Sequence, residues 1–341
     1  MKAIELDVGN DTVDAFRTVE RPVPDPGPGQ VRVRLKAASL NYRDLSVARG
    51  TYPGTDGDTS VVPLSDGAGV VDAVGEGVTR FEAGDRVTNT FSQVPTDAPP
   101  SADRQALGLP LDGTLQEQRV FHENGLVHVP ETLSLEQAAT LPCAAQTAWH
   151  ALFGAGRPVL PGQTVLTLGT GGVSTFALLF AKAAGARVLI TSSSDDKLEQ
   201  MRALGADTTI NYERTPDWHE AVQDATDGRG VDCVVEVGGA GTLERSMQAV
   251  APEGKIGLIG VLTEAEENPS PYPLMQRRAH LHGIYVGDIE HPLDSFRAMN
   301  AAIDANDIEP VLDRTFDIES VPEAYQHLAE AGHVGKVVVT I

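Results

Sequence analysis

Hydrophobic positions in the second half of the chain predict alternating strands and helices. Short apolar runs typical of buried strands recur between residues 160 and 287, and segments with apolar residues at helical spacing separate them. The predicted strands cover 164–168, 187–191, 207–210, 231–237, 255–260 and 282–286. The predicted helices cover 174–184, 195–204, 217–226, 241–251 and 272–278. This alternation indicates a doubly wound parallel sheet.

The rest of the chain has a different pattern. Residues 1–90 contain short alternating segments broken by prolines and glycines, which predicts a compact β-rich domain. Residues 92–112 are an irregular excursion of a length that is often functional. Helical spacing begins after Ser134, a suitable N-cap, and a helix over 292–305 and a strand over 336–340 close the chain.

A glycine-rich turn joins the strand at 164–168 to the helix that follows it. The turn consists of Gly169, Thr170, Gly171, Gly172, Val173 and Ser174. Glycines let a backbone approach a pyrophosphate, and unpaired N–H groups at a helix N-terminus attract its charge. Strand, turn and helix therefore predict a dinucleotide-binding unit, although a glycine turn that binds nothing is the alternative. Ser174 replaces the usual third glycine and is small enough to keep the helix close to the strand.

Length and charge narrow the classes of function. A chain of 341 residues suggests about two domains, and no stretch approaches the ~20 apolar residues of a membrane span. The acidic N-terminus does not resemble a signal peptide, so a cytoplasmic location is expected. The net charge of −22 predicts neither a nucleic-acid nor a membrane partner. It fits either a high-salt habitat or acidic drift in a G+C-rich genome.

Ordered motifs occur along nearly the whole chain, in the segments 38–45, 67–71, 84–87, 138–149, the glycine turn and 335–339. Together they resemble the medium-chain dehydrogenase/reductase superfamily, nearest its zinc-independent, quinone-oxidoreductase-like branch. The resemblance implies an α/β fold with a GroES-like β-rich catalytic domain and a Rossmann domain whose parallel sheet has six strands. The catalytic domain would comprise residues 1–150 and 288–341, and the Rossmann domain residues 151–287.

Zinc-dependent members of this family bind a catalytic ion through a Cys, a His or Glu, and a further Cys or Asp. By resemblance these positions are Asn41, Ser65 and Cys143. One thiolate does not hold zinc, because catalytic sites use about three protein ligands. The chain has only two cysteines, and residues 92–112 contain none. We therefore expect no metal, with Cys143 as a small packing residue or, as the alternative, a nucleophile.

The predicted cofactor is NADP(H), favoured over NAD(H). NAD-specific proteins place an acid at the end of the second strand, whereas Thr191 and Ser192 end it here. Ser193, Ser194 and Lys197 could bind a 2′-phosphate, and the resemblance assigns the same role to Lys197 and Tyr212. Asp195 and Asp196 oppose this assignment unless their side chains point away. The resemblance implies further cofactor contacts at Asn41, Thr147, Gly238, Gly260, Val261, Gly287, His333 and Lys336.

The candidate catalytic residues are Asn41, Tyr52 and Tyr42. The Asn41 amide can donate a hydrogen bond to a carbonyl oxygen, and either tyrosine can donate a phenolic proton or simply pack. The sequence contains no clear proton relay, which favours reduction of a quinone or an α,β-unsaturated carbonyl over alcohol oxidation. An alcohol or aldehyde dehydrogenase and a non-catalytic nucleotide-binding sensor are the alternatives. The resemblance also implies a homodimer acting on a small carbonyl or quinone substrate.

Overall fold

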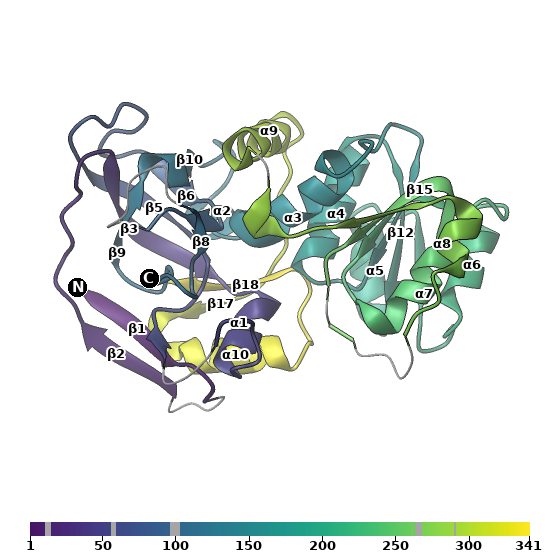
Figure 1. The fold of residues 1–341 in the computed structure, drawn as a ribbon, viewed down its shortest axis with the longest axis horizontal. Coiled ribbons are helices and arrows are strands. Elements are labelled where there is room, and N and C mark those ends of the chain that lie inside the picture. The colour runs from purple at the N-terminus through teal and green to yellow at the C-terminus, as the bar shows by residue number, and fades with distance from the viewer. Residues whose placement is uncertain (11–14, 56–58, 96–102, 261, 264–267, 290) are drawn as a thin grey trace. The chain divides into compact units, whose positions relative to one another are not determined.

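The computed structural model describes the whole chain except residues 11–14, 56–58, 96–102, 261, 264–267 and 290. The chain divides into two compact units (Figure 1). The terminal unit contains residues 1–146 and 286–341, and the central unit contains residues 147–285. The sequence analysis placed these boundaries at 150 and 288. No helix among the described residues has the length and apolar composition needed to cross a bilayer.

Six strands form the sheet of the central unit. They are β11 (Thr164–Leu168), β12 (Arg187–Ser192), β13 (Thr208–Asn211), β14 (Val231–Glu236), β15 (Val250–Leu258) and β16 (His280–Gly283). Their order is β13-β12-β11-β14-β15-β16, and every neighbouring pair is parallel. The predicted α/β fold with a doubly wound, six-stranded Rossmann sheet is confirmed.

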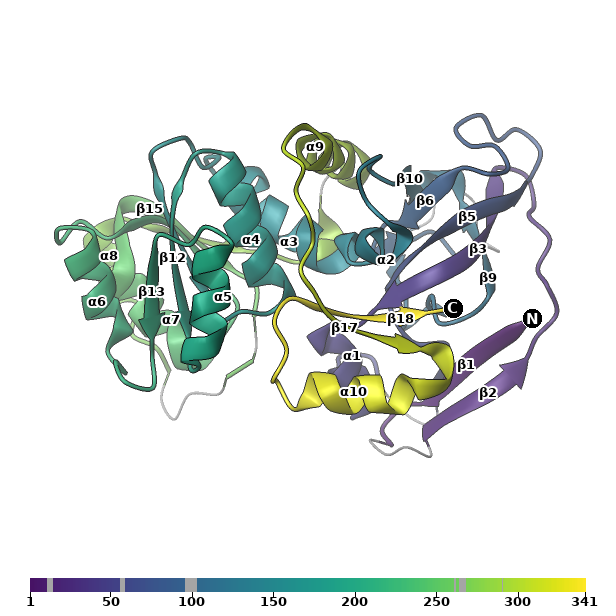
Figure 2. The ribbon, with the colours of Figure 1, turned by 180° about the vertical axis from the view of Figure 1, so that it is seen from behind.

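Helices cover both faces of this sheet. They are α4 (Gly172–Ala183), α5 (Asp195–Ala203), α6 (Trp218–Ala225), α7 (Ala240–Ala249) and α8 (Tyr272–Arg277). Figure 2 shows α4 and α5 on one side of the strands and α6, α7 and α8 on the other. Trp218 and Met247 pack from α6 and α7 against Leu166 and Val234 of the central strands. Apolar side chains on both faces explain why these strands read as continuous hydrophobic runs.

The terminal unit is built mainly of antiparallel strands. Its largest sheet has the order β10-β6-β5-β3-β18-β17, and β9 also pairs with β3. These strands are β3 (Gln30–Ser39), β5 (Asp66–Val74), β6 (Arg86–Asn89), β9 (Gln118–His122), β10 (Leu126–His128), β17 (Leu312–Asp317) and β18 (Lys336–Thr340). Both parts of the chain therefore contribute to one sheet, where β18, in yellow, lies beside β3, in purple (Figure 1).

Smaller elements complete the terminal unit. Two minor sheets contain β1 (Lys2–Asp7), β2 (Phe16–Glu20) and β4 (Ser60–Val61), and then β7 (Ser92–Gln93) and β8 (Gln105–Ala106). The helices are α1 (Tyr42–Ala48), α2 (Leu135–Ala138), α9 (Pro292–Ala305) and α10 (Val321–Ala329), and α3 (Gln146–Trp149) spans the boundary between the units. Ser134 caps α2 as predicted, since its Oγ accepts a hydrogen bond from Gln137 N at 3.2 Å.

Some elements differ from the sequence prediction. Strand β15 begins at Val250 rather than 255, and β16 ends at Gly283 rather than 286. Neither β17 nor α10 was predicted. The irregular stretch 92–112 contains the short pair β7–β8, and residues 96–102 lie outside the described residues.

Candidate functional site

The glycine turn of the central unit offers an open backbone surface. Gly169 has a φ of +71°, and nothing lies within 4 Å of the position that a Cβ atom would occupy. Gly171 is the N-cap of α4, and no side chain caps this helix end. Thr170 precedes this N-cap, and Gly172 and Val173 are the first two residues of α4. Backbone N–H groups without a side-chain cap fit the negative charge of a pyrophosphate.

Ser174 fills the position of the third glycine without pushing the helix away. The residue is buried, and its Oγ donates a hydrogen bond to Leu168 O at 2.6 Å. The hydroxyl therefore links the first turn of α4 to the last residue of β11. The expectation that serine preserves close helix–strand packing is confirmed.

The first carboxylate after β12 is paired. Asp195, the first residue of α5, accepts a hydrogen bond from Asn211 Nδ2 at 2.9 Å and pairs with the Arg214 guanidinium. The hydrogen bond from Asn211, together with the charge of Arg214, lowers the pKa of Asp195. Asp195 is therefore ionised, and the Arg214 guanidinium neutralises its negative charge. This arrangement answers the objection for Asp195, whereas the exposed Asp196 remains a negative charge close to this position.

Polar and basic groups surround the same strand end. Ser193 is exposed, and the Ser194 Oγ accepts from Lys197 N at 3.4 Å as the N-cap of α5. Tyr212 follows β13, with 38% of its surface exposed. The exposed Arg214 is a basic group that the sequence analysis did not consider, although it lies two residues after Tyr212.

The glycines after β14 and β15 have structural explanations. The buried Glu236 carboxylate accepts hydrogen bonds from Gly238 N at 2.8 Å, Gly239 N at 3.0 Å and Thr242 Oγ1 at 2.7 Å. A Cβ atom at Gly260 would lie 1.4 Å from Val237 O, so only glycine fits there. Gly238 and Gly260 therefore have a structural role at the carboxyl ends of β14 and β15. Their role as cofactor contacts stays a prediction.

The remaining predicted cofactor residues are spread over both units. Thr147 is buried in α3 of the central unit. Gly287 lies in the short turn Val286–Asp288, and His333 precedes β18, both in the terminal unit. Val261 lies outside the described residues.

A buried lysine of the terminal unit contacts Asn41, one of the candidate catalytic residues. Lys336 is 3% exposed, and its Nζ donates to Leu40 O and to Asn41 Oδ1, each at 2.5 Å. Asp66 Oδ2 lies 3.9 Å from the same Nζ. The role of Lys336 as a cofactor contact stays a prediction. No sequence signal pointed to its pairing with Asn41.

This contact fixes the orientation of the Asn41 side chain. An ammonium group only donates hydrogen bonds, so the amide oxygen of Asn41 must face Lys336 and the amide nitrogen must face away. Asn41 Nδ2 is buried and has no hydrogen-bond partner among the described residues. A buried donor without a partner is costly unless a ligand satisfies it. Asn41 thus presents a preoriented N–H donor.

The groups at the zinc-ligand positions do not fit a zinc ion. Asn41 offers an amide, and the Ser65 hydroxyl donates to Asp66 Oδ1 at 2.7 Å. Burial, followed by the charge of Asp66, raises the pKa of the half-buried Cys143 thiol above its usual range. This shift opposes a nucleophilic role, since the thiolate is the nucleophile. Moreover, the Lys336 ammonium already brings positive charge to Asn41 and Asp66.

Among the residues that the structure describes, no group of three or more His, Cys, Asp and Glu side chains could hold a metal ion.

The two candidate tyrosines differ in their surroundings. Tyr52 is partly buried, and the Arg43 guanidinium lies 4.7 Å from the centre of its ring. Arg43 also donates to Leu107 O at 2.9 Å and to Leu109 O at 3.3 Å, which fixes it in place. Tyr42 begins α1 and is 45% exposed. Tyr52 is therefore held next to a fixed positive charge, whereas Tyr42 is the more accessible ring.

The buried Asp44 carboxyl makes the stability of the protein depend on pH. Burial raises its pKa from 3.8 to about 6, although Arg43 opposes the shift. Asp44 Oδ2 accepts from Asn41 N at 2.7 Å. The folded protein holds a proton on Asp44 more tightly than the unfolded chain, so this group's contribution to stability falls as pH rises from about 4 to 6.

We expect Asp44→Asn to remove this dependence, since an amide oxygen can still accept from Asn41 N. The free energy of unfolding of the variant, relative to that of the unmodified protein, should rise by up to ~3 kcal/mol as the pH increases from 4 to 7. Urea denaturation of both proteins across this range measures the difference. A difference that stays constant with pH contradicts the prediction.

Comparisons with known proteins agree with this architecture. Residues 27–131 match the family model "Alcohol dehydrogenase GroES-like domain", and residues 172–305 match "Zinc-binding dehydrogenase". A zinc-type alcohol dehydrogenase-like protein of Schizosaccharomyces pombe is 46% identical over 339 residues, covering 96% of each chain. A 2-haloacrylate reductase of a Burkholderia species is 34% identical over 251 residues, covering 72% of this chain and 69% of the relative.

Solved structures give the same result. An NAD-dependent alcohol dehydrogenase is 33% identical, with a TM-score of 0.86 and all of both chains covered. A quinone oxidoreductase of Pseudomonas syringae pv. tomato DC3000 is 28% identical, with a TM-score of 0.82, covering 100% of this chain and 99% of that one. A mycobacterial protein complexed with NADPH is 26% identical, with a TM-score of 0.83 and full coverage of both chains. The chain therefore belongs to the medium-chain dehydrogenase/reductase superfamily of oxidoreductases.

Proposed function

We propose that this protein is a zinc-independent, NADPH-dependent reductase of quinones or α,β-unsaturated carbonyl compounds. The observation that carries the proposal is the buried Asn41 Nδ2 donor, which Lys336 orients and no described residue satisfies. Such a donor suits an oxygen atom that gains negative charge, as the carbonyl oxygen of a quinone or enone does when carbon accepts a hydride. A relative that reduces 2-haloacrylate and a structural neighbour that acts on quinones support this class of substrate.

In this proposal the chain's own residues bind, orient and stabilise. NADPH, held on the glycine turn from Gly169 to Ser174, supplies the hydride when bound. Asn41 Nδ2 donates to the substrate oxygen, and the Lys336 ammonium behind it strengthens this donor because it polarises the amide. Solvent supplies the proton that completes the reduction, so no side chain has to act as a general acid.

The activity test follows NADPH absorbance with a panel of simple quinones and enones. Acceptor-dependent oxidation supports the proposal. Oxidation of alcohols with NADP+, without any turnover of quinones or enones, would instead favour an alcohol dehydrogenase. Cofactor binding without turnover of either class would favour a nucleotide-binding sensor.

The proposed preference for NADPH predicts a selective effect at Lys197. Lys197→Ala should weaken NADPH binding about tenfold and leave NADH binding unchanged, because only NADPH carries the 2′-phosphate. Fluorescence titration with each cofactor measures both affinities. The matched control is Lys182→Ala on the neighbouring α4, since Lys182 pairs with Asp207 at 2.9 Å and should not affect either cofactor. Equal losses for NADPH and NADH would refute the assignment.

We also propose a homodimer formed through β16. Among the described strands, β16 pairs only with β15, so its outer edge leaves backbone hydrogen-bonding groups available. Apolar side chains are exposed nearby, including Leu281 at 40%, Tyr285 at 53% and Met275 at 66%. Two copies related by a twofold axis could pair these edges. Light scattering of the purified protein tests the dimer, and a monomer would exclude it.

A further inference from the structure

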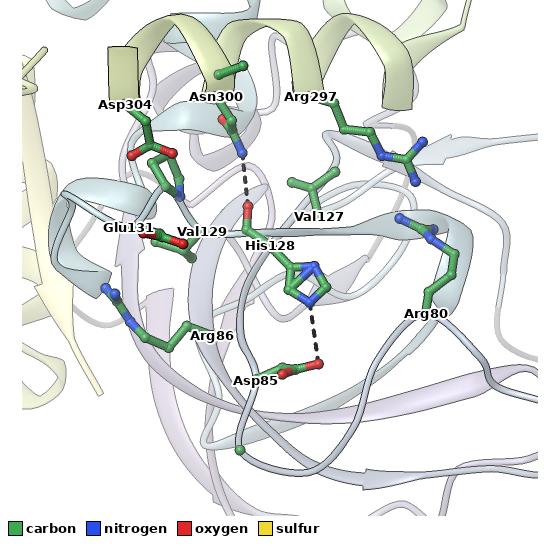
Figure 3. Close-up of a pocket in the computed structure, with 13 residues that line it drawn as sticks. Arg80, Asp85, Arg86, Val127, His128, Val129, Glu131, Arg297, Asn300 and Asp304 are labelled. Carbon is green, nitrogen blue, oxygen red and sulfur yellow. Dashed lines mark hydrogen bonds and ion pairs between the residues drawn. The ribbon is translucent and has the colours of Figure 1, made fainter. Parts of the chain in front are cut away.

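A pocket in the terminal unit, lined by none of the candidate site residues above, contains an unusual grouping of charges. Its volume is about 770 Å³, and all of its lining residues belong to the terminal unit. Figure 3 shows Arg80, Arg297 and His128 on one side, and Arg86, Glu131 and Asp304 on the other. The volume lies within the ~300–1,000 Å³ typical of small-molecule sites.

On the basic side of this pocket His128 pairs with Asp85 at 3.3 Å, whereas the Arg80 guanidinium has no carboxylate partner in the described part of the chain (Figure 3). Burial and the nearby charge of Arg297 lower the pKa of Arg80, so the two guanidinium groups repel each other. Arg80 forms no ion pair among the described residues, and Arg297 has only a contact with Asp294 at 3.5 Å. Keeping two like charges together is unfavourable unless an anion joins them. This grouping is notable in a chain with a net charge of −22.

Arg80 is fixed in position by neutral acceptors. Its Nη1 donates to Glu123 O at 2.6 Å, and its Nη2 donates to Leu126 O at 3.1 Å. The guanidinium also lies 5.0 Å from the centre of the Phe81 ring. Since a guanidinium has five N–H donors, others remain for a ligand. Arg80 is therefore a preorganised donor for an oxyanion.

Asn300 adds an independent observation. The residue is 8% exposed, and its Nδ2 donates to His128 O at 2.9 Å, which fixes the amide orientation. Asn300 Oδ1 is then a buried acceptor with no partner among the described residues. It lies in the pocket wall between the two sides (Figure 3). A ligand hydroxyl would satisfy this acceptor, as it would the carboxylates of Glu131 and Asp304.

We infer that this pocket binds a small phosphorylated polyhydroxy compound. The phosphate group lies between Arg80 and Arg297, and the hydroxyl groups reach Asn300 and the acidic side. Charge-assisted hydrogen bonds from two arginines supply most of the affinity, and the unpaired acceptor supplies the selectivity for a hydroxylated ligand. The inference does not depend on the proposed reaction, because none of these residues takes part in it.

Calorimetric titration at constant ionic strength tests the inference with glycerol 3-phosphate, inorganic phosphate and glycerol. We expect saturable binding of glycerol 3-phosphate, weaker binding of phosphate and none of glycerol. Arg80→Gln and Arg297→Gln should each weaken binding of glycerol 3-phosphate at least about tenfold. Arg17→Gln, on an exposed part of β2, is the matched control for loss of positive charge and should bind normally.

Arg214→Gln separates this pocket from the central unit, where a cofactor phosphate could also bind. Retained binding in this variant supports the inference, and lost binding overturns it. The absence of saturable binding by glycerol 3-phosphate, or normal binding in both pocket variants, also overturns the inference. Equal affinity for inorganic phosphate would contradict the role of Asn300 and thus the ligand class.

Discussion

Asn41→Asp is expected to abolish most reductase activity while preserving the fold. The aspartate can keep one oxygen on the Lys336 ammonium, which now meets a full negative charge. Its other oxygen then takes the place of the Nδ2 donor and can only accept hydrogen bonds. Instead of stabilising negative charge on the substrate oxygen, this residue repels it. We expect kcat to fall at least ~100-fold, the usual effect of removing one such donor.

Steady-state kinetics with the best quinone or enone substrate measure this loss. The urea midpoint should change little, because the hydrogen bond from Lys336 and the backbone of α1 remain. Asn306→Asp, at the exposed C-cap of α9, controls for added negative charge and should be fully active. A kcat within about threefold of the unmodified enzyme would show that Asn41 does not act as the donor.

Lys336→Met is expected to cause the largest loss of stability. Methionine fills the space of the lysine stem but leaves Leu40 O, Asn41 Oδ1 and the Asp66 carboxylate without the ammonium. Removing one member of a buried ion pair typically costs ~3–5 kcal/mol, because the other charge stays buried. Urea denaturation at pH 7 measures the change in the free energy of unfolding.

The double variant Lys336→Met/Asp66→Asn separates the ion pair from simple loss of packing. Asparagine can still accept the hydrogen bond from Cys143 N, which is 3.2 Å long for Asp66, but carries no charge. The free energy of unfolding of the double variant should therefore be ~1–3 kcal/mol higher than that of Lys336→Met alone. Equal stability of the single and double variants would show that the charge of Asp66 is not what Lys336 compensates.

The sequence predicted the central unit well because its elements have strong local signals. Apolar runs separated by polar turns located β11, β12 and β14 to within a residue or so. By contrast, β17 reads Leu-Asp-Arg-Thr-Phe-Asp, is largely solvent-facing and has no hydrophobic run. It is a strand because it pairs with β18. Such tertiary pairing leaves no periodic trace in a single sequence.

The candidate site was predictable only in part. The glycine turn and Asn41 lie in short motifs, so the sequence could single them out. The contact between Lys336 and Asn41 joins residues 295 positions apart, and no spacing rule connects them. Asp44 and Asp66 were also missed, because a carboxylate next to a motif is ordinarily a surface residue and only burial shows otherwise. Arg80 and Arg297 were missed because they lie far apart in the chain and no spacing rule connects them.

The position of β18 has a consequence for the order of events during synthesis. The central unit is one continuous segment, so it can fold while the ribosome still holds the last part of the chain. The large sheet of the terminal unit cannot close until β18 enters between β3 and β17. That strand begins with Lys336, which orients Asn41. A growing chain could therefore fold its central unit early, and the contact between Lys336 and Asn41 would form only after β18 has left the exit tunnel.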